Sequence, residues 1–240
     1  MTREQQLSRV FVELADTMVA EYDVLDLLHT LADSTVELLH VDAAGIILSD
    51  QRGHLQVIAS TTHQARLMEL FTLQNSEGPC LDCFNTGQRV VNVDPAEAKS
   101  RWPRFKAESA EVGYQSTHAI PLRLRDRVIG AMNLFCIENS ILTDDDIALG
   151  QGLADIATIG LLQERVVRQQ ELLAEQLQTA LNTRILIEQA KGVLSERAGM
   201  DVDEAFATMR TYSRQMRLRL SSVAGGVIDG SLTADDLLKG

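Results

Sequence analysis

The chain has 240 residues, 45% of them hydrophobic and 23% charged, with a net charge of −12, a composition that fits one substantial globular domain and a smaller unit. No apolar run reaches the roughly 18 to 20 residues that a membrane span needs, and the N-terminus lacks the apolar core of a secretory signal, so we expect a cytoplasmic protein. Its three cysteines, an odd number, favour reduced thiols over a disulfide framework.

Two amphipathic helices are predicted at the start of the chain. Residues 2–21 carry one apolar stripe with polar residues on the other sides, and a second helix is expected from Val24 to about His40. Either both helices cover a sheet, or the first pairs with its copy in a dimer. The stripe of the first helix consists of Leu7, Val10, Phe11, Leu14 and Met18.

The middle of the chain alternates short β-rich runs with short helices. Residues 51–53 read as a hairpin turn between the first two strands, and Gly113 as the end of the last helix. An antiparallel α+β sandwich follows from this order of elements. The expected strands are residues 43–50, 54–61, 89–93, 114–123 and 127–136, and the expected helices are residues 64–71, 80–86 and about 102–112.

Three segments of this region carry a family likeness: EGPCLDCFNTGQRVVNVD at 77–94, RWPRF at 101–105 and STHAIPLRLRDRVIGAMNLF at 116–135. Through them the chain resembles a GAF domain over roughly residues 25–162, and it is similar to the actinobacterial branch of that family. The resemblance implies a regulatory module that binds a small ligand, a tetrapyrrole or an iron cluster, or that mediates dimerisation. It leaves the ligand and any cofactor unknown.

Cys80 and Cys83 form a C-x-x-C pair, which can act as a redox dithiol or supply half of a metal site. A structural zinc needs four ligands, and His63, His118 and Cys136 are the plausible additions. Because free cysteines are commonly buried and inert, we expect inert thiols, with a redox or metal role as the alternative. His118 alternates within a predicted strand, so it should be packed or line a pocket.

Motifs of the common catalytic sites are missing from the sequence. It has no P-loop, no G-x-G-x-x-G after a strand, no H-E-x-x-H and no G-x-S-x-G. Its many carboxylates form no recurrent pair on one element that would indicate acid–base catalysis. We therefore expect a protein that is not an enzyme.

A long helix is predicted from Thr143, which should cap it, to about Glu196, without an interrupting proline. Apolar residues fall into sevens from residue 166, which indicates a short coiled coil. A dimeric signalling helix is favoured here over a plain linker. One seam row holds Val166, Leu173, Ala180 and Ile187, and the partnering row holds Gln170, Leu177 and Arg184.

Charge is distributed unevenly along the chain. Residues 182–240 hold eight basic and eight acidic residues, whereas the preceding 181 residues hold 14 basic and 26 acidic. A neutral segment with its arginines on one face can still bind phosphate locally. Its non-specific affinity for nucleic acid should be weaker than that of a strongly basic module, so shape and stacking have to contribute.

Three helices are expected at the C-terminus. The first is the end of the long helix, and Asp201 with Glu204 reads as a capping box that opens the second. A third should run from about residue 221 to residue 228 and stop at Gly230. Along the end of the second helix, one side is lined by Arg210, Arg214 and Arg217.

The segment RILIEQAKGVLSERAGMDVDEAFATMRTYSR, residues 184–214, resembles the ANTAR family of RNA-binding antitermination domains. The resemblance implies a three-helix bundle that holds paired stem-loops of nascent mRNA and so prevents a terminator hairpin. Ala190 and Gly192 would permit close approach if exposed, or helix packing if buried, and Tyr212 should be core. The paired Gly225 and Gly226 depart from the family pattern. The residues implied to face RNA are Arg184, Ala190, Lys191, Gly192, Arg210, Ser213 and Arg214.

The sequence thus predicts an α+β protein with an N-terminal helix and GAF sensor in residues 1–162, a helical linker or coiled coil in 163–181 and an ANTAR domain in 182–240. The predicted function is signal-responsive antitermination by a homodimer that binds paired mRNA stem-loops and detects a small-molecule or redox signal. Two alternatives remain open. One is a DNA-binding transcriptional regulator, and the other is a sensor or scaffold that acts through protein partners.

Overall fold

The computed structural model describes residues 3–17, 23–50 and 52–239, and the chain divides into two compact units, Met1–Arg165 and Val166–Gly240. Across the described residues, no helix combines the length and the apolar character that crossing a membrane requires.

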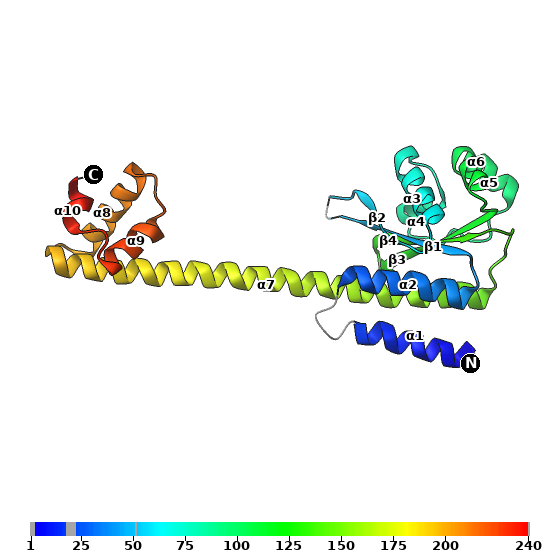
Figure 1. The fold of residues 1–240 in the computed structure, drawn as a ribbon, viewed down its shortest axis with the longest axis horizontal. Helices are drawn as coiled ribbons and strands as arrows, with labels where there is room; N and C mark the ends of the chain where they lie inside the picture. The colour runs from blue at the N-terminus through cyan, green and yellow to red at the C-terminus, as the bar shows by residue number, and fades with distance from the viewer. Residues whose placement is uncertain (1–2, 18–22, 51, 240) are drawn as a thin grey trace. The chain divides into compact units, whose positions relative to one another are not determined.

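The first unit is built on a four-stranded antiparallel sheet with strand order β2-β1-β4-β3 (Figure 1). Its strands match four of the five predicted strands to within two residues. In the first hairpin the Asp50 carboxylate accepts hydrogen bonds from the backbone N–H groups of Arg52 and His54, at 2.7 and 2.8 Å, while Gln51 lies outside the described residues. The strands are β1 (Ala43–Ser49), β2 (Leu55–Ser60), β3 (Ser116–Leu124) and β4 (Arg127–Cys136).

One face of the sheet is covered by α2 (Val24–Leu39) and the first part of α7 (Asp144–Ala198), and α1 (Arg3–Thr17) packs against α2 in an outer layer (Figure 1). Val10 and Leu14 of α1 are buried in the same core as the inner face of α2, so α2 covers the sheet as expected, whereas α1 packs on α2. Pairing of the first helix with its copy in a dimer stays a prediction. Residues 18–21 of the predicted first helix lie outside the described residues.

Four short helices cover the opposite face: α3 (His63–Asn75), α4 (Pro79–Thr86), α5 (Pro95–Arg101) and α6 (Pro103–Glu111) (Figure 1). The last three begin at a proline, whose fixed φ and missing N–H suit the first turn of a helix. Their apolar residues form a second core against the sheet. The sheet therefore separates two cores, as an α+β sandwich requires.

The predicted strand at residues 89–93 is wrong. Only Val90 pairs there, through two backbone hydrogen bonds with Ala119, and Asn92 adopts a left-handed conformation with φ 54° that ends the extended run. Helix α5, which the periodicity did not predict, follows at once. Its signal is local, because Asp94 caps the backbone N–H groups of the first turn and Pro95 stands at the first helical position.

The second unit consists of the end of α7 with α8 (Val202–Gln215), α9 (Leu220–Asp229) and α10 (Ala234–Lys239). The three predicted helices are present, whereas α10 was not predicted, although Thr233 and Asp236 form its capping box. Apolar side chains from all four helices share one core, with Tyr212 among them as expected. The core includes Leu194, Met209, Val223, Val227 and Leu237.

One of the three predicted features at helix ends is present in the structure. Thr143 caps α7 as expected, in a reciprocal pair with Asp146. Asp201 does stand at the cap position of α8, but its side chain makes no capping hydrogen bond, so the predicted box with Glu204 is wrong. Arg217 does not continue the row of Arg210 and Arg214, because α8 has already ended and the residue is left-handed.

Candidate functional sites

The outer side of α8 carries free positive charge. Arg210 and Arg214, one turn apart, are exposed, and their side chains make no hydrogen bond or ion pair within the described part of the chain, while Met209 and Tyr212 of the same helix are buried. From residue 205 to residue 228 the sequence contains four arginines and no acidic residue. This stretch is therefore locally basic inside a neutral unit, a charge pattern that attracts phosphate.

Lys191 is engaged inside the bundle. Its side chain is 14% exposed, its Nζ lies 2.9 Å from an oxygen of Glu188, and the ammonium stands 5.6 Å from the ring centroid of Phe206. The ion pair and the cation–π contact occupy the charge. Lys191 therefore offers much less free charge than Arg210 or Arg214.

The two small residues next to Lys191 differ in position. Ala190 is fully buried between the helices, so of the two expected roles it has the packing role and does not face RNA. Gly192 is exposed, and a Cβ placed there would meet nothing within 4 Å. Helix packing thus gives no reason for glycine at this position.

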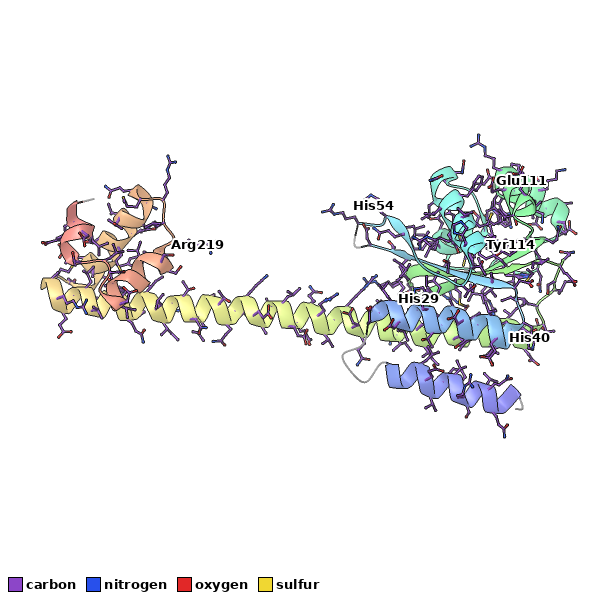
Figure 2. All side chains as sticks on the ribbon, in the orientation of Figure 1. His29, His40, His54, Glu111, Tyr114 and Arg219 are labelled. Atoms are coloured by element: carbon purple, nitrogen blue, oxygen red, sulfur yellow. The ribbon has the colours of Figure 1, made fainter. Side chains whose placement is uncertain are left out.

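Of the other candidate residues, Arg184 is exposed on α7. Ser213 is half-buried, and its Oγ donates a hydrogen bond to the carbonyl oxygen of Leu218 at 2.7 Å. Its hydroxyl therefore holds the turn that follows α8. Arg219, at the start of α9, lies at the outer edge of these helices (Figure 2).

A buried polar cluster in the first unit was not predicted from the sequence. Glu69 of α3 is fully buried against the sheet, and its two carboxylate oxygens lie 2.7 and 2.8 Å from Nδ2 of Asn133 on β4. The Sγ of Cys80 on α4 is 4.0 Å from the same carboxyl group. The oxygen Oδ1 of Asn133 has no hydrogen-bond partner among the described residues.

The space for the Glu69 carboxyl group is provided by Gly45 of β1. A Cβ at position 45 would stand 2.2 Å from Oε1 of Glu69, closer than two such atoms can approach. Burial raises the pKa of Glu69 to about 7, although the hydrogen bond from Asn133 lowers it. The domain therefore contains an acid that changes its charge close to neutral pH.

Cys80 and Cys83 are both buried in the core between the sheet and the helices α3–α6. Burial and the nearby Glu69 raise the pKa of the Cys80 thiol, and burial raises the pKa of Cys83 to about 12. Because the thiolate is the reactive form, these environments favour inert thiols.

The expected additional metal ligands do not join this pair. Cys136 belongs to the core on the other side of the sheet, and His63 is exposed at the start of α3. His118 is packed, as expected, and burial lowers its pKa to about 4. Throughout the residues described, no three side chains of His, Cys, Asp or Glu gather in a way that could hold a metal ion.

A narrow cleft lies on the side of the sheet that α3–α6 cover. Its volume is about 20 Å³, which is room for one water molecule. It is lined by Trp102, Phe105, Lys106 and Thr117 among others, and neither Cys80 nor Glu69 lines it. Next to this region Tyr114 stacks at 5.0 Å from Phe135 in the interior (Figure 2).

Comparison with solved structures identifies the fold of the first unit. The GAF domain of a phosphoenolpyruvate-protein phosphotransferase from Coxiella burnetii is 15% identical with a TM-score of 0.55, and the match covers 70% of this chain and 96% of that chain. The corresponding Acinetobacter GAF domain is 16% identical with a TM-score of 0.51, covering 70% and 98%. A free methionine-R-sulfoxide reductase from Neisseria meningitidis is 17% identical with a TM-score of 0.51, covering 69% and 91%.

No curated protein matches the chain. The family models do match: the GAF domain model over residues 21–162 and the ANTAR domain model over residues 175–228. A GAF domain acts as a signal sensor, and an ANTAR domain implies RNA binding in transcription antitermination. Since the first model spans more than half of the sequence, the protein belongs to the GAF domain family and carries a C-terminal ANTAR domain.

Proposed function

We propose that this protein is a signal-responsive antitermination regulator of the actinobacterial type, which acts in the cytoplasm by binding paired stem-loops of nascent mRNA so that a terminator hairpin does not form. The observation that carries the proposal is the pair of exposed arginines, Arg210 and Arg214, on the outer side of α8 in the ANTAR domain. Guanidinium groups free of internal partners can hold phosphates or stack on unpaired bases.

The candidate residues have different roles in this proposal. Arg184, Gly192, Arg210 and Arg214 contact RNA, since all four are exposed and none is used by the core. Ser213 positions the turn after α8, and Lys191 lies at the margin of the interface. RNA contacts from Ser213 and Lys191 are not required for binding, because phosphate contacts from several arginines can supply most of the affinity.

A second copy of the chain is the proposed partner of α7. Every residue from 166 to 182 is exposed, including Leu177 at 63%, although Leu173 and Leu177 have apolar side chains. Pairing of two copies would bury this stripe and present two ANTAR domains to two stem-loops, which raises avidity without new contacts. In this proposal residues 1–162 are the sensor, 163–181 the coiled-coil linker and 182–240 the RNA-binding domain.

Dimerisation through α7 has its own test. Leu173→Ser together with Leu177→Ser should convert a dimer into a monomer in sedimentation velocity runs. The exposed pair Leu67→Ser and Leu70→Ser on α3 is the matched control, because it removes the same apolar groups outside the predicted seam. A wild-type monomer, or a dimer unaffected by the change on α7, would contradict this assignment.

For the sensor, we propose a small-molecule signal in preference to a redox signal at Cys80 and Cys83. The raised pKa values of both thiols support this choice. We propose that the ligand binds where α3 or α4 separates from the sheet, because this opening would expose Glu69 and Asn133, whose polar groups could then hold it.

RNA binding is tested by Arg210→Ala combined with Arg214→Ala. Affinity for an RNA of two hairpins should fall about ten-fold or more, and the slope of log K against log salt concentration should fall by about 1 to 2, because two phosphate contacts are lost. Arg66→Ala with Arg89→Ala removes the same charge from exposed GAF positions and should leave both quantities unchanged. Circular dichroism checks that each variant is folded.

The same assay separates the rival functions. Unchanged RNA affinity in the Arg210 and Arg214 variant would remove α8 from the interface. Preferential binding of duplex DNA over the two-hairpin RNA at equal salt would favour a DNA-binding regulator. Failure of the wild-type protein to bind either nucleic acid would favour a sensor that acts through protein partners.

A further inference from the structure

The turn between α8 and α9, residues Met216–Arg219, has the hydrogen bonds of a helix C-cap. The N–H of Leu218 donates to the carbonyl of Ser213 at 2.9 Å, and the N–H of Arg217 donates to the carbonyl of Arg214 at 3.3 Å. The Oγ of Ser213 closes the turn from the other side, on the carbonyl of Leu218. This is the six-to-one and five-to-two pattern that surrounds a left-handed residue.

The left-handed residue here is Arg217, with φ 54°. Glycine is strongly preferred at such a position because a Cβ crowds the following carbonyl oxygen. Glycine stands at three other helix ends, where Gly87, Gly199 and Gly230 have φ values of 65°, 65° and 81°, while His40 and Ser76 are left-handed at two more, each with φ 52°. The backbone conformation of the turn therefore gives no reason for an arginine at position 217.

Nothing inside the protein uses the Arg217 side chain either. It is exposed and forms no hydrogen bond or ion pair within the described ranges, and the same holds for Arg219. The guanidinium group of Arg217 is therefore available for a contact outside the molecule, and Arg219 beside it is available in the same way.

The side chains of the turn alternate in character. Met216 and Leu218 are 53% and 47% exposed, and they alternate with Arg217 and Arg219. Apolar groups next to unpaired guanidinium groups match the unstacked bases and phosphates of an RNA loop, whereas a duplex keeps its base faces covered. Because residues 205–228 include no acidic residue, every charged side chain near the turn in the sequence is positive.

We propose that the Met216–Arg219 turn is an RNA-contacting element, in which Arg217 and Arg219 hold loop phosphates while Met216 and Leu218 pack against unpaired bases. The inference rests on the proposed RNA-binding function. It extends the interface beyond residue 214, where the motif segment identified in the sequence ends.

Arg217→Gly is the discriminating variant, because glycine relieves the backbone strain and removes the side chain at the same time. Its Tm should equal or exceed that of the wild type, while RNA affinity falls about five-fold or more and the salt slope falls by about 0.7 to 0.9. Arg125→Gly is the matched control, since Arg125 is also an exposed left-handed arginine with φ 54°, in the turn between β3 and β4. Its Tm should also rise, with RNA binding unchanged.

The probe is a fluorescein-labelled RNA of two hairpins, selected by the wild-type protein from a library with randomised loops, and binding is followed by anisotropy with the full-length protein. A second variant, Met216→Ser with Leu218→Ser, should weaken binding with an unchanged salt slope, because it removes apolar contacts only.

Wild-type affinity and salt slope in Arg217→Gly would overturn the inference while leaving the proposed function in place. An effect of both turn variants on phosphatidylglycerol vesicles, with RNA binding unchanged, would also overturn it and make the turn a lipid contact. If the library yields no RNA for the wild-type protein, the proposed function fails first, and the inference fails with it.

Discussion

Nδ2 of Asn133 donates to both carboxylate oxygens of Glu69, so that an amide from β4 and an acid from α3 meet in the interior of the GAF domain. Burial raises the pKa of Glu69 from 4.5 to about 7, which means that the folded protein keeps a proton that the unfolded chain loses. The contribution of protonated Glu69 to the stability of the folded state is therefore fully present below pH 4.5 and is lost as the pH rises through 7.

Glu69→Gln should remove this pH dependence. The free energy of unfolding of the variant relative to the wild type should increase by about 2 to 3 kcal/mol between pH 5 and pH 8, because the buried charge is no longer formed. Urea denaturation at a series of pH values measures the difference. Glu111→Gln, at an exposed position of α6, is the control and should give a flat difference. A flat difference for Glu69→Gln as well would contradict the raised pKa.

The thiols of Cys80 and Cys83 should react slowly in the folded protein. With a pKa of about 12, Cys83 has roughly one thiolate in 10⁴ at pH 8, and both sulfur atoms are buried. Alkylation by iodoacetamide, followed by mass spectrometry, should be about 100-fold slower or more than in urea-unfolded protein. Fast labelling of either cysteine in the folded state would restore the redox interpretation.

The two neighbouring glycines of α9 should respond in opposite directions to alanine. A Cβ at Gly225 meets nothing within 4 Å, so Gly225→Ala should raise the free energy of unfolding by up to about 1 kcal/mol through helix propensity. A Cβ at Gly226 would stand 2.8 and 2.9 Å from two carbons of Leu232, so Gly226→Ala should destabilise the protein by about 1 to 3 kcal/mol. Thermal and urea unfolding measure both changes, and equal effects would refute the packing argument.

Helix caps provide a further matched pair. Asp94 accepts hydrogen bonds from two backbone N–H groups of α5, whereas the Asp201 side chain caps nothing on α8. Asp94→Ala should therefore cost about 1 kcal/mol of stability, and Asp201→Ala only a few tenths. If the two losses measured by urea unfolding are the same, Asp201 has a capping role in solution that the structure does not show.

Periodicity predicted the long elements of the fold and failed at α5 and α10. The strands β3 and β4 and the helices α2 and α8 show their patterns over nine or more residues, which is enough to reveal which face is buried. Helices α5 and α10 have seven and six residues, too few for a periodic signal, and only their caps at Asp94 and Thr233 mark them. The segment around Val90 resembled a strand because Val90 itself does pair, with Ala119.

The candidate sites were predictable to different degrees. The ANTAR resemblance predicted RNA-facing residues within 184–214. A motif does not show that Ala190 is buried or that Lys191 is paired, because both depend on packing between helices. The burial of Glu69 was not predicted, although its spacing from Ala65 and Thr72 places it on the buried side of α3. Acidic residues are so often exposed that helical spacing alone does not indicate a buried acid.

The tight fit between Gly45 and Glu69 links the choice of amino acid at two positions that lie far apart in the sequence. Gly45→Ala should damage the domain while position 69 holds a long side chain, and a shortened residue such as alanine at 69 should rescue it. Homologous chains should therefore show covariation between these sites, with glycine retained on the strand only where the helix contributes the buried acid.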